Sequence, residues 1–193
     1  MTRTVRNIVL SSVAATLLVA PAGAQQVQQR MQRSNLTAEL LKDINQVQEK
    51  LTGLAKAIPA DKWGWRPGEG VRSVGGVFMH VAADNYLLPA GLGTMAPAAT
   101  GIKPEDYSTV QAFENKELSK DATVMELEKS FAHLKTALEG ATPMGDDIQM
   151  FGQTFTRTGF LVLMTTHLHE HLGQMIAYAR SVGVVPPWSR GGN

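Results

Sequence analysis

The sequence contains no cysteine, and this absence limits the chemistry that the chain can perform. Without cysteine there are no disulfides, no thiolate metal ligands and no cysteine nucleophile. A metal or catalytic site must therefore use histidine, carboxylates, hydroxyls or lysine. Histidine itself is scarce, with five in 193 residues. The positions of these histidines become the main question about function.

The chain also lacks an excess of charge of either sign, with 18 Lys and Arg against 17 Asp and Glu. Proteins that bind nucleic acid usually carry Lys and Arg clustered on one face, and this sequence has no basic run. We therefore expect no nucleic-acid partner. The hydrophobic content of 44% is that of an ordinary globular protein, and the length suits one folded domain.

Residues 1–24 have the pattern of a secretory signal peptide. Arg3 and Arg6 give a positive start, residues 8–20 are mostly apolar, and residues 22–24 (Ala-Gly-Ala) form a small-residue cleavage site. The apolar stretch is shorter than the roughly 20 residues that a membrane-spanning helix needs. We therefore predict that the chain is exported, that the mature protein is periplasmic or extracellular, and that it has no stable membrane insertion after cleavage.

The first half of the mature chain contains two segments in which apolar residues recur at steps of three and four, the spacing of one helical face. One covers residues 37–58 and ends before Pro59. The other begins after Ser73, a suitable N-cap, and ends before Pro89. Both segments are predicted to be amphipathic helices.

The second half contains two more segments with this spacing. One is predicted to begin near Thr123, which resembles a capping box together with Glu126, and to end at Gly140. The other runs from about Phe160 to Gly183, and glycine suits the first position beyond a helix end. These segments complete a set of four helices.

Four amphipathic helices without a convincing alternating strand pattern predict an all-α four-helix bundle. Residues 89–120 and 141–156 are expected to be long connections after the second and third helices, with a short helical turn near residues 110–115. The predicted organisation is a signal peptide at 1–24, a polar lead at 25–33, the bundle domain at 34–188 and a tail at 189–193.

Three of the five histidines fall on apolar helix faces. His167 and His171 are four residues apart on the last helix, where side chains at this spacing are neighbours and can bind one ion. His80 lies on the apolar face of the second helix, together with Asp84. Three converging imidazoles suit a divalent ion such as Zn, Ni, Fe or Mn and leave a position for water or substrate. Buried polar groups are unfavourable unless they are paired or metallated, which favours a metal site.

Other interpretations of these side chains are open. A histidine inside a bundle is often a hydrogen-bonded core residue rather than a ligand. Asp84 could orient an imidazole, complete the coordination, act as a general base on bound water, or be a polar residue near a helix end. Gln174, one turn beyond His171, could hydrogen-bond substrate or bound water. His133 lies beside the apolar face and is expected at the surface, and His169 is expected to face solvent or at most to contact a metal ligand.

Two segments carry a resemblance to a known family. Residues 65–82 begin with Trp-Arg-Pro and continue through Ser73 to His80, which resembles the W-R-P-x5-S-x6-H pattern of the DinB-like superfamily. Residues 167–174 (HLHEHLGQ) resemble the other signature of that family, H-x3-H-x-G-Q, with Leu172 at a position that is often Arg. The likeness covers nearly all of residues 35–188.

This resemblance implies a DinB-type four-helix bundle, often dimeric, with a three-histidine metal site at His80, His167 and His171. Members of the family are commonly described as metal-dependent hydrolases. Related branches transfer small thiols such as mycothiol or bacillithiol, or isomerise maleylpyruvate.

The sequence therefore supports two classes of function. The first is an exported metal-dependent hydrolase of an unknown small molecule, in which the ion lowers the pKa of bound water toward about 7 and Asp84 accepts a proton. The second is a non-catalytic metal-binding or stress-related bundle, such as a homodimer, in which the ion stabilises the fold. A small-thiol transferase is a further alternative, which export disfavours because such thiols are chiefly cytoplasmic.

Overall fold

The computed structural model describes residues 22–141 and 145–191, with the backbone alone for residue 22 and residues 24–35. This part of the chain contains five α-helices, one β-hairpin and four short 3-10 helices. The α-helices are α1 (Ala22–Ala57), α2 (Val74–Leu87), α3 (Tyr107–Glu114), α4 (Lys120–Gly140) and α5 (Arg157–Ser181). The remaining elements are β1 (Ile148–Met150), β2 (Gln153–Phe155), η1 (Ala60–Lys62), η2 (Leu88–Leu92), η3 (Ala98–Thr100) and η4 (Pro187–Ser189).

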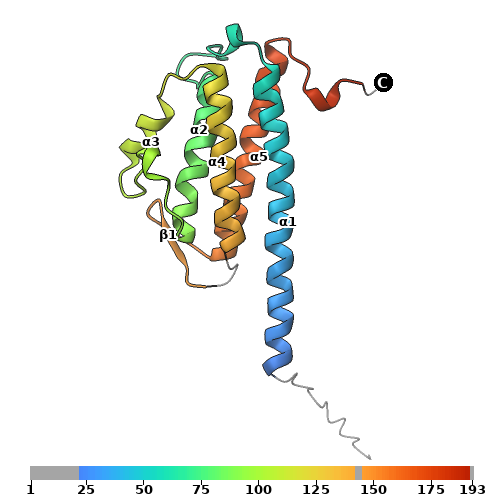
Figure 1. Cartoon of the computed structure of the whole chain (residues 1–193), viewed down its shortest axis with the longest axis vertical. Coiled ribbons are helices and arrows are strands. Elements are labelled where there is room, and N and C mark those ends of the chain that lie inside the picture. Colours follow the sequence, from blue (N-terminus) through green and yellow to red (C-terminus); the bar gives the residue numbers. More distant parts are fainter. Residues whose placement is uncertain (1–21, 142–144, 192–193) are drawn as a thin grey trace, which may run out of the picture.

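The predicted four-helix bundle is confirmed, and it consists of α1, α2, α4 and α5 (Figure 1). Both α1 and α2 pack against α4 and α5, so α1 and α2 occupy opposite corners of the bundle. The short helix α3 lies outside the bundle against α2. Because α2 and α5 are neighbours, side chains from these two helices can meet in the interior.

The first helix is longer than its apolar pattern predicts. It begins at Ala22 and so includes the polar lead at 25–33 and the last residues of the predicted signal peptide, whose residues 1–21 lie outside the described part of the chain. Figure 1 shows this first part of α1 extending beyond the other bundle helices. None of the helices in the described residues is both long and apolar enough to span a bilayer.

The helix caps agree with the sequence prediction at two of three ends. Ser73 caps α2, since its Oγ accepts a hydrogen bond from the backbone N–H of Gly76 at 3.1 Å. At the end of α5, Gly183 has a φ of 80°, and the next N–H, that of Val184, donates to the carbonyl of Ala179 at 2.8 Å. This is the pairing of a Schellman motif.

The predicted start of the helix at Thr123 is wrong. The helix α4 begins at Lys120, and its N-cap is Ser119, whose Oγ accepts from the N–H of Ala122. Thr123 is buried in the first turn, where its hydroxyl donates to the carbonyl of Ser119 at 3.0 Å. The capping-box pattern predicts the wrong start because the Thr123 hydroxyl donates to a backbone carbonyl one turn earlier and does not cap the helix.

The core contains the residues that the apolar spacing indicates. Leu51, Phe131, Leu134 and Leu138 are all at most 1% exposed. The helix α2 differs from an ordinary amphipathic helix, because nearly all of its residues are buried. The connection at 89–120 folds back over its outer side and includes α3, which corresponds to the predicted helical turn near 110–115.

The second connection contains a β-hairpin, which the sequence did not predict. Strands β1 and β2 are antiparallel, with Met150 opposite Gln153, so Phe151 and Gly152 form a two-residue turn. Both turn residues have positive φ, 56° and 70°, as type I′ hairpin turns require. Strands of three residues are too short to show an alternating pattern, and such a hairpin depends on packing against the rest of the protein. Ile148 supplies this packing and is buried.

The expectation that His133 lies at the surface is wrong. His133 is half-buried on α4 against the ring of Tyr86, with ring centroids 5.5 Å apart. Its Nε2 atom is buried and has no hydrogen-bond partner among the described residues. Burial lowers the pKa of His133 below its ordinary value, because desolvation disfavours the charged ring.

This burial predicts a loss of stability in acid. As the pH falls below the unfolded-state pKa of about 6.5, the unfolded chain binds a proton that folded His133 resists, so the free energy of unfolding decreases. H133F removes this contribution and should lose less stability than the wild type between pH 7.5 and pH 5 in urea unfolding. Identical pH slopes for H133F and the wild type would contradict the assignment.

Candidate metal centre

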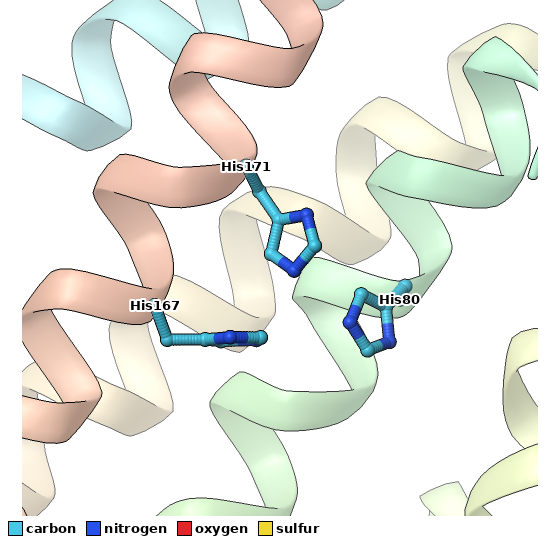
Figure 2. A group of neighbouring side chains, drawn as sticks. All are labelled: His80, His167 and His171. Atoms are coloured by element: carbon cyan, nitrogen blue, oxygen red, sulfur yellow. The ribbon is translucent and has the colours of Figure 1, made fainter.

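The three histidines on the apolar helix faces meet inside the bundle. His80 comes from α2, and His167 and His171 come from adjacent turns of α5 (Figure 2). One nitrogen atom from each ring lies within 4.8 Å of the nitrogens from the other two. His80 and His171 are only 8% and 7% exposed, and His167 is half-buried. The predicted convergence of the three imidazoles is therefore present.

The ring of His80 is held by a carboxylate from outside the bundle. Its Nδ1 atom donates to Oε1 of Glu114 at 2.8 Å, and Glu114 is the last residue of α3. The other carboxylate oxygen of Glu114 accepts from the guanidinium of Arg72 at 3.0 Å. Burial raises the pKa of Glu114, but the hydrogen bonds and charges of His80 and Arg72 outweigh burial and hold the pKa below its ordinary value. Glu114 is therefore ionised at neutral pH and can only accept.

The ring of His171 is held in the same way by an amide. Its Nδ1 atom donates to Oε1 of Gln174 at 2.8 Å, and the amide nitrogen of Gln174 donates to the hydroxyl of Tyr178 at 3.1 Å. That hydroxyl donates to the backbone carbonyl of Arg72 at 3.3 Å. Because both ends of its amide are engaged, Gln174 is better placed to orient His171 than to contact a substrate.

Arg72 connects the two chains of hydrogen bonds, one through its guanidinium and one through its backbone. Its loop is fixed to the start of α2, where the N–H of Gly75 donates to the carbonyl of Trp63 at 3.0 Å. A Cβ atom at Gly75 would lie only 2.5 Å from the indole of Trp63, so this close approach requires glycine. The ring of Trp65 packs edge-on against Tyr178. The loop before α2, with Trp63, Trp65 and Arg72, thus positions the partners of the histidines.

These contacts leave the histidines in a form that can bind a metal ion. An acceptor at Nδ1 holds the hydrogen there when the ring is neutral, which leaves Nε2 of His80 and of His171 as the atoms that could bind an ion. In His80 this atom also lies 3.3 Å from Oδ2 of Asp84. Burial lowers the pKa of His171, and the neighbouring His167 and His80 lower it further, while the hydrogen bond to Gln174 acts in the opposite direction. The net shift favours the neutral ring that metal binding needs. Three such imidazoles fit a divalent ion.

Asp84 lies beside the same group of rings. Its Oδ2 atom is 2.7 Å from Nε2 of His167 and 3.3 Å from Nε2 of His80, and its side chain is nearly buried. His80, Asp84 and Glu114 also form a group with ligand atoms within 4.8 Å of one another. Asp84 is thus more than a polar residue near a helix end, and it can orient a ring, act as a ligand or accept a proton.

The other two histidines lie away from this centre. The Nε2 atom of His169 pairs with Oδ2 of Asp43 on α1 at 2.7 Å, in an exposed position, as expected for a solvent-facing residue. His133 lies on α4, half-buried against Tyr86.

Sequence reasoning missed three residues of the centre, namely Glu114, Arg72 and Tyr178. Glu114 is 34 residues from His80 in the chain, and no helical spacing connects them. Tyr178 lies on the apolar face of α5, where helical spacing alone does not distinguish a hydrogen-bonding residue from a core residue. The one available signal is the predicted helical turn near residues 110–115, which contains Glu114.

Comparisons with known proteins agree with this architecture. The sequence pattern of the DinB family matches residues 31–192. A solved DinB-like protein from Bacillus subtilis is 19% identical, with 76% of this chain and 93% of that chain covered and a TM-score of 0.57. A DinB-like protein from Bacillus cereus is 18% identical, with 77% and 93% covered and a TM-score of 0.61.

A third solved structure is a variant of a mycothiol-dependent maleylpyruvate isomerase. It is 16% identical, with 80% of this chain and 63% of that chain covered and a TM-score of 0.53. At these identities the solved structures show a shared fold. No match was found among curated proteins. The match over residues 31–192 shows that this chain belongs to the DinB family.

Proposed function

We propose that this protein is a metal-dependent hydrolase of a small molecule, with His80, His167 and His171 as the metal ligands. The observation that carries the proposal is the group of three imidazole nitrogens within 4.8 Å of one another, two of them oriented through Nδ1. When bound by such a group, a divalent ion supplies Lewis acidity that activates water near neutral pH.

The side chains around the histidines have separate roles in this proposal. Glu114 and Gln174 hold two of the rings in one orientation. Asp84 faces the Nε2 side of His80 and His167, where it can accept a proton from the attacking water and return it to the leaving group. A cavity of about 320 Å³ reaches Asp84 and His167, so a small substrate has access to this side. Access of this kind favours catalysis over a purely structural metal site.

We further propose that the mature chain functions outside the cytoplasm after cleavage near Ala24. The support is the order of the positive start, the apolar segment and the Ala-Gly-Ala site at the beginning of the sequence. A non-catalytic, metal-stabilised bundle is the alternative, and the variants described next separate the two.

Metal content tests the ligands directly. The purified protein loaded with Zn²⁺ should retain about one ion per chain after desalting, and H167A should lose it because two imidazoles bind far more weakly than three. H169A, two residues further along the same helix, should retain the ion. Elemental analysis of the three proteins gives the answer, and equal zinc in H167A and H169A would refute the site.

The hydrogen bond from His80 to Glu114 should strengthen metal binding. E114Q removes the charge that fixes the hydrogen on Nδ1, and loss of such a partner typically weakens metal affinity by about 10- to 100-fold. E117Q, at an exposed position three residues away, is the matched control. Competition with a chromophoric chelator measures both affinities. Unchanged zinc affinity in E114Q would show that Glu114 only supports the fold.

The role of Asp84 can be separated from metal binding. If Asp84 is the proton acceptor, D84N should retain zinc but hydrolyse 4-nitrophenyl acetate at least about 100-fold more slowly than the zinc-loaded wild type, as expected for loss of a general base. Zinc analysis and hydrolysis rates are measured on the same preparation. Loss of zinc from D84N would instead identify Asp84 as a ligand.

A further inference from the structure

The cavity beside the metal centre has walls from three separate elements. Leu88 comes from η2 at the end of α2, Leu163 comes from α5, and Phe151 and Phe155 come from the β-hairpin. Asp84 and His167 form its inner end. The volume of about 320 Å³ is at the lower limit of the roughly 300–1,000 Å³ that ligand sites occupy, which restricts the occupant to a small molecule.

The lining of this cavity is apolar with one polar end. The side chains of Leu88, Phe151, Phe155 and Leu163 offer no hydrogen bonds, and Gln153 is the only polar lining residue besides Asp84 and His167. No Lys or Arg is among the lining residues, all of which are described. A charged group placed among these apolar side chains would have no Lys or Arg in the lining to balance it. Away from Asp84 and His167, the lining therefore favours an uncharged, apolar part of a ligand.

The backbone conformation of Phe151 is unfavourable, and burial of its side chain does not compensate for the cost. Its φ of 56° lies in the left-handed region, which costs a non-glycine residue free energy and where Asn or Gly would be favoured in this turn. The ring is 52% exposed, so burial returns little of this cost. In this conformation Phe151 lines the cavity. Strain of this kind is typical of binding sites.

We propose that this cavity binds the apolar group of a small, uncharged ester or amide substrate, and that Phe151 is a specificity-determining residue of the site. A phenyl or branched alkyl group lies among Leu88, Leu163 and Phe155 under the Phe151 ring, and the carbonyl is directed to Asp84 and His167. The identity of the reaction rests on the proposed hydrolase function. The binding of the apolar group depends on the cavity alone.

The first test uses three probes of one size and different charge on the metal-free wild-type protein. Benzamide, benzoate and benzylamine are titrated separately, and their affinities are measured by ligand-observed NMR. We expect benzamide to bind at least about tenfold more tightly than benzoate. Tighter binding of either charged probe than of benzamide, or no binding of benzamide, would overturn the proposal.

The second test locates the bound probe. L163W places a larger side chain in the cavity and should abolish benzamide binding, whereas V162W adds the same ring at the adjacent position of α5, which is 44% exposed and does not line the cavity. Thermal unfolding of both variants verifies that they fold. Equal benzamide affinity in the two variants would place the probe elsewhere.

The third test separates the ligand role of Phe151 from a role in folding. F151N creates an Asn-Gly turn, the preferred type I′ sequence, so the melting temperature should be equal or higher. Benzamide affinity should nevertheless fall about tenfold, because an aromatic ring of the cavity lining is lost. Unchanged affinity in F151N would refute the role of Phe151.

These binding measurements are independent of the hydrolase assignment. Loss of benzamide binding in L163W and F151N together with failure of the wild type to hold zinc would sustain the cavity and refute the proposed metal chemistry. Zinc retention and ester hydrolysis with no benzamide binding would sustain the proposed metal chemistry and refute the proposed role of the cavity.

Discussion

The structure depends on one constraint, which is that polar side chains inside a close-packed bundle must have partners. Three imidazoles and Asp84 occupy a level of the core that apolar residues would otherwise fill. The hydrogen bonds from His80 to Glu114 and from His171 to Gln174 meet this requirement on the Nδ1 side. The Nε2 side is left facing a common space, and this is the side on which chemistry is possible.

Segments between the bundle helices supply part of these partners. Nearly all of α2 is buried, and the connection at 89–120 brings α3 and Glu114 against it. The loop before α2 supplies Arg72, which contacts both sets of partners through its side chain and its backbone. A segment outside the four helices therefore orients His80, whereas His171 is held by Gln174 on α5 itself, whose partner Tyr178 donates to the loop before α2.

The β-hairpin also lies outside the four helices, and it forms part of the cavity beside the histidines. A regular four-helix bundle fills its interior with side chains and leaves little room for a ligand. Here the hairpin covers the end of α2 and the start of α5 and forms the outer wall of a cavity that reaches His167. Phe151, with its φ of 56°, is one of the residues of this wall.

The sequence alone determined the four bundle helices, their main core residues and the convergence of His80, His167 and His171, because helical spacing fixes which side chains share a face. It also determined the caps at Ser73 and Gly183, which depend on neighbouring residues only. It misplaced the start of α4 and the environment of His133, since each depends on atoms that are distant in the chain or on competing local hydrogen bonds. Only the tertiary structure decided that Glu114 and Arg72 support the histidines and that Phe151 meets His167 across a cavity. These contacts join segments separated by irregular connections, and no periodic pattern carries across such segments.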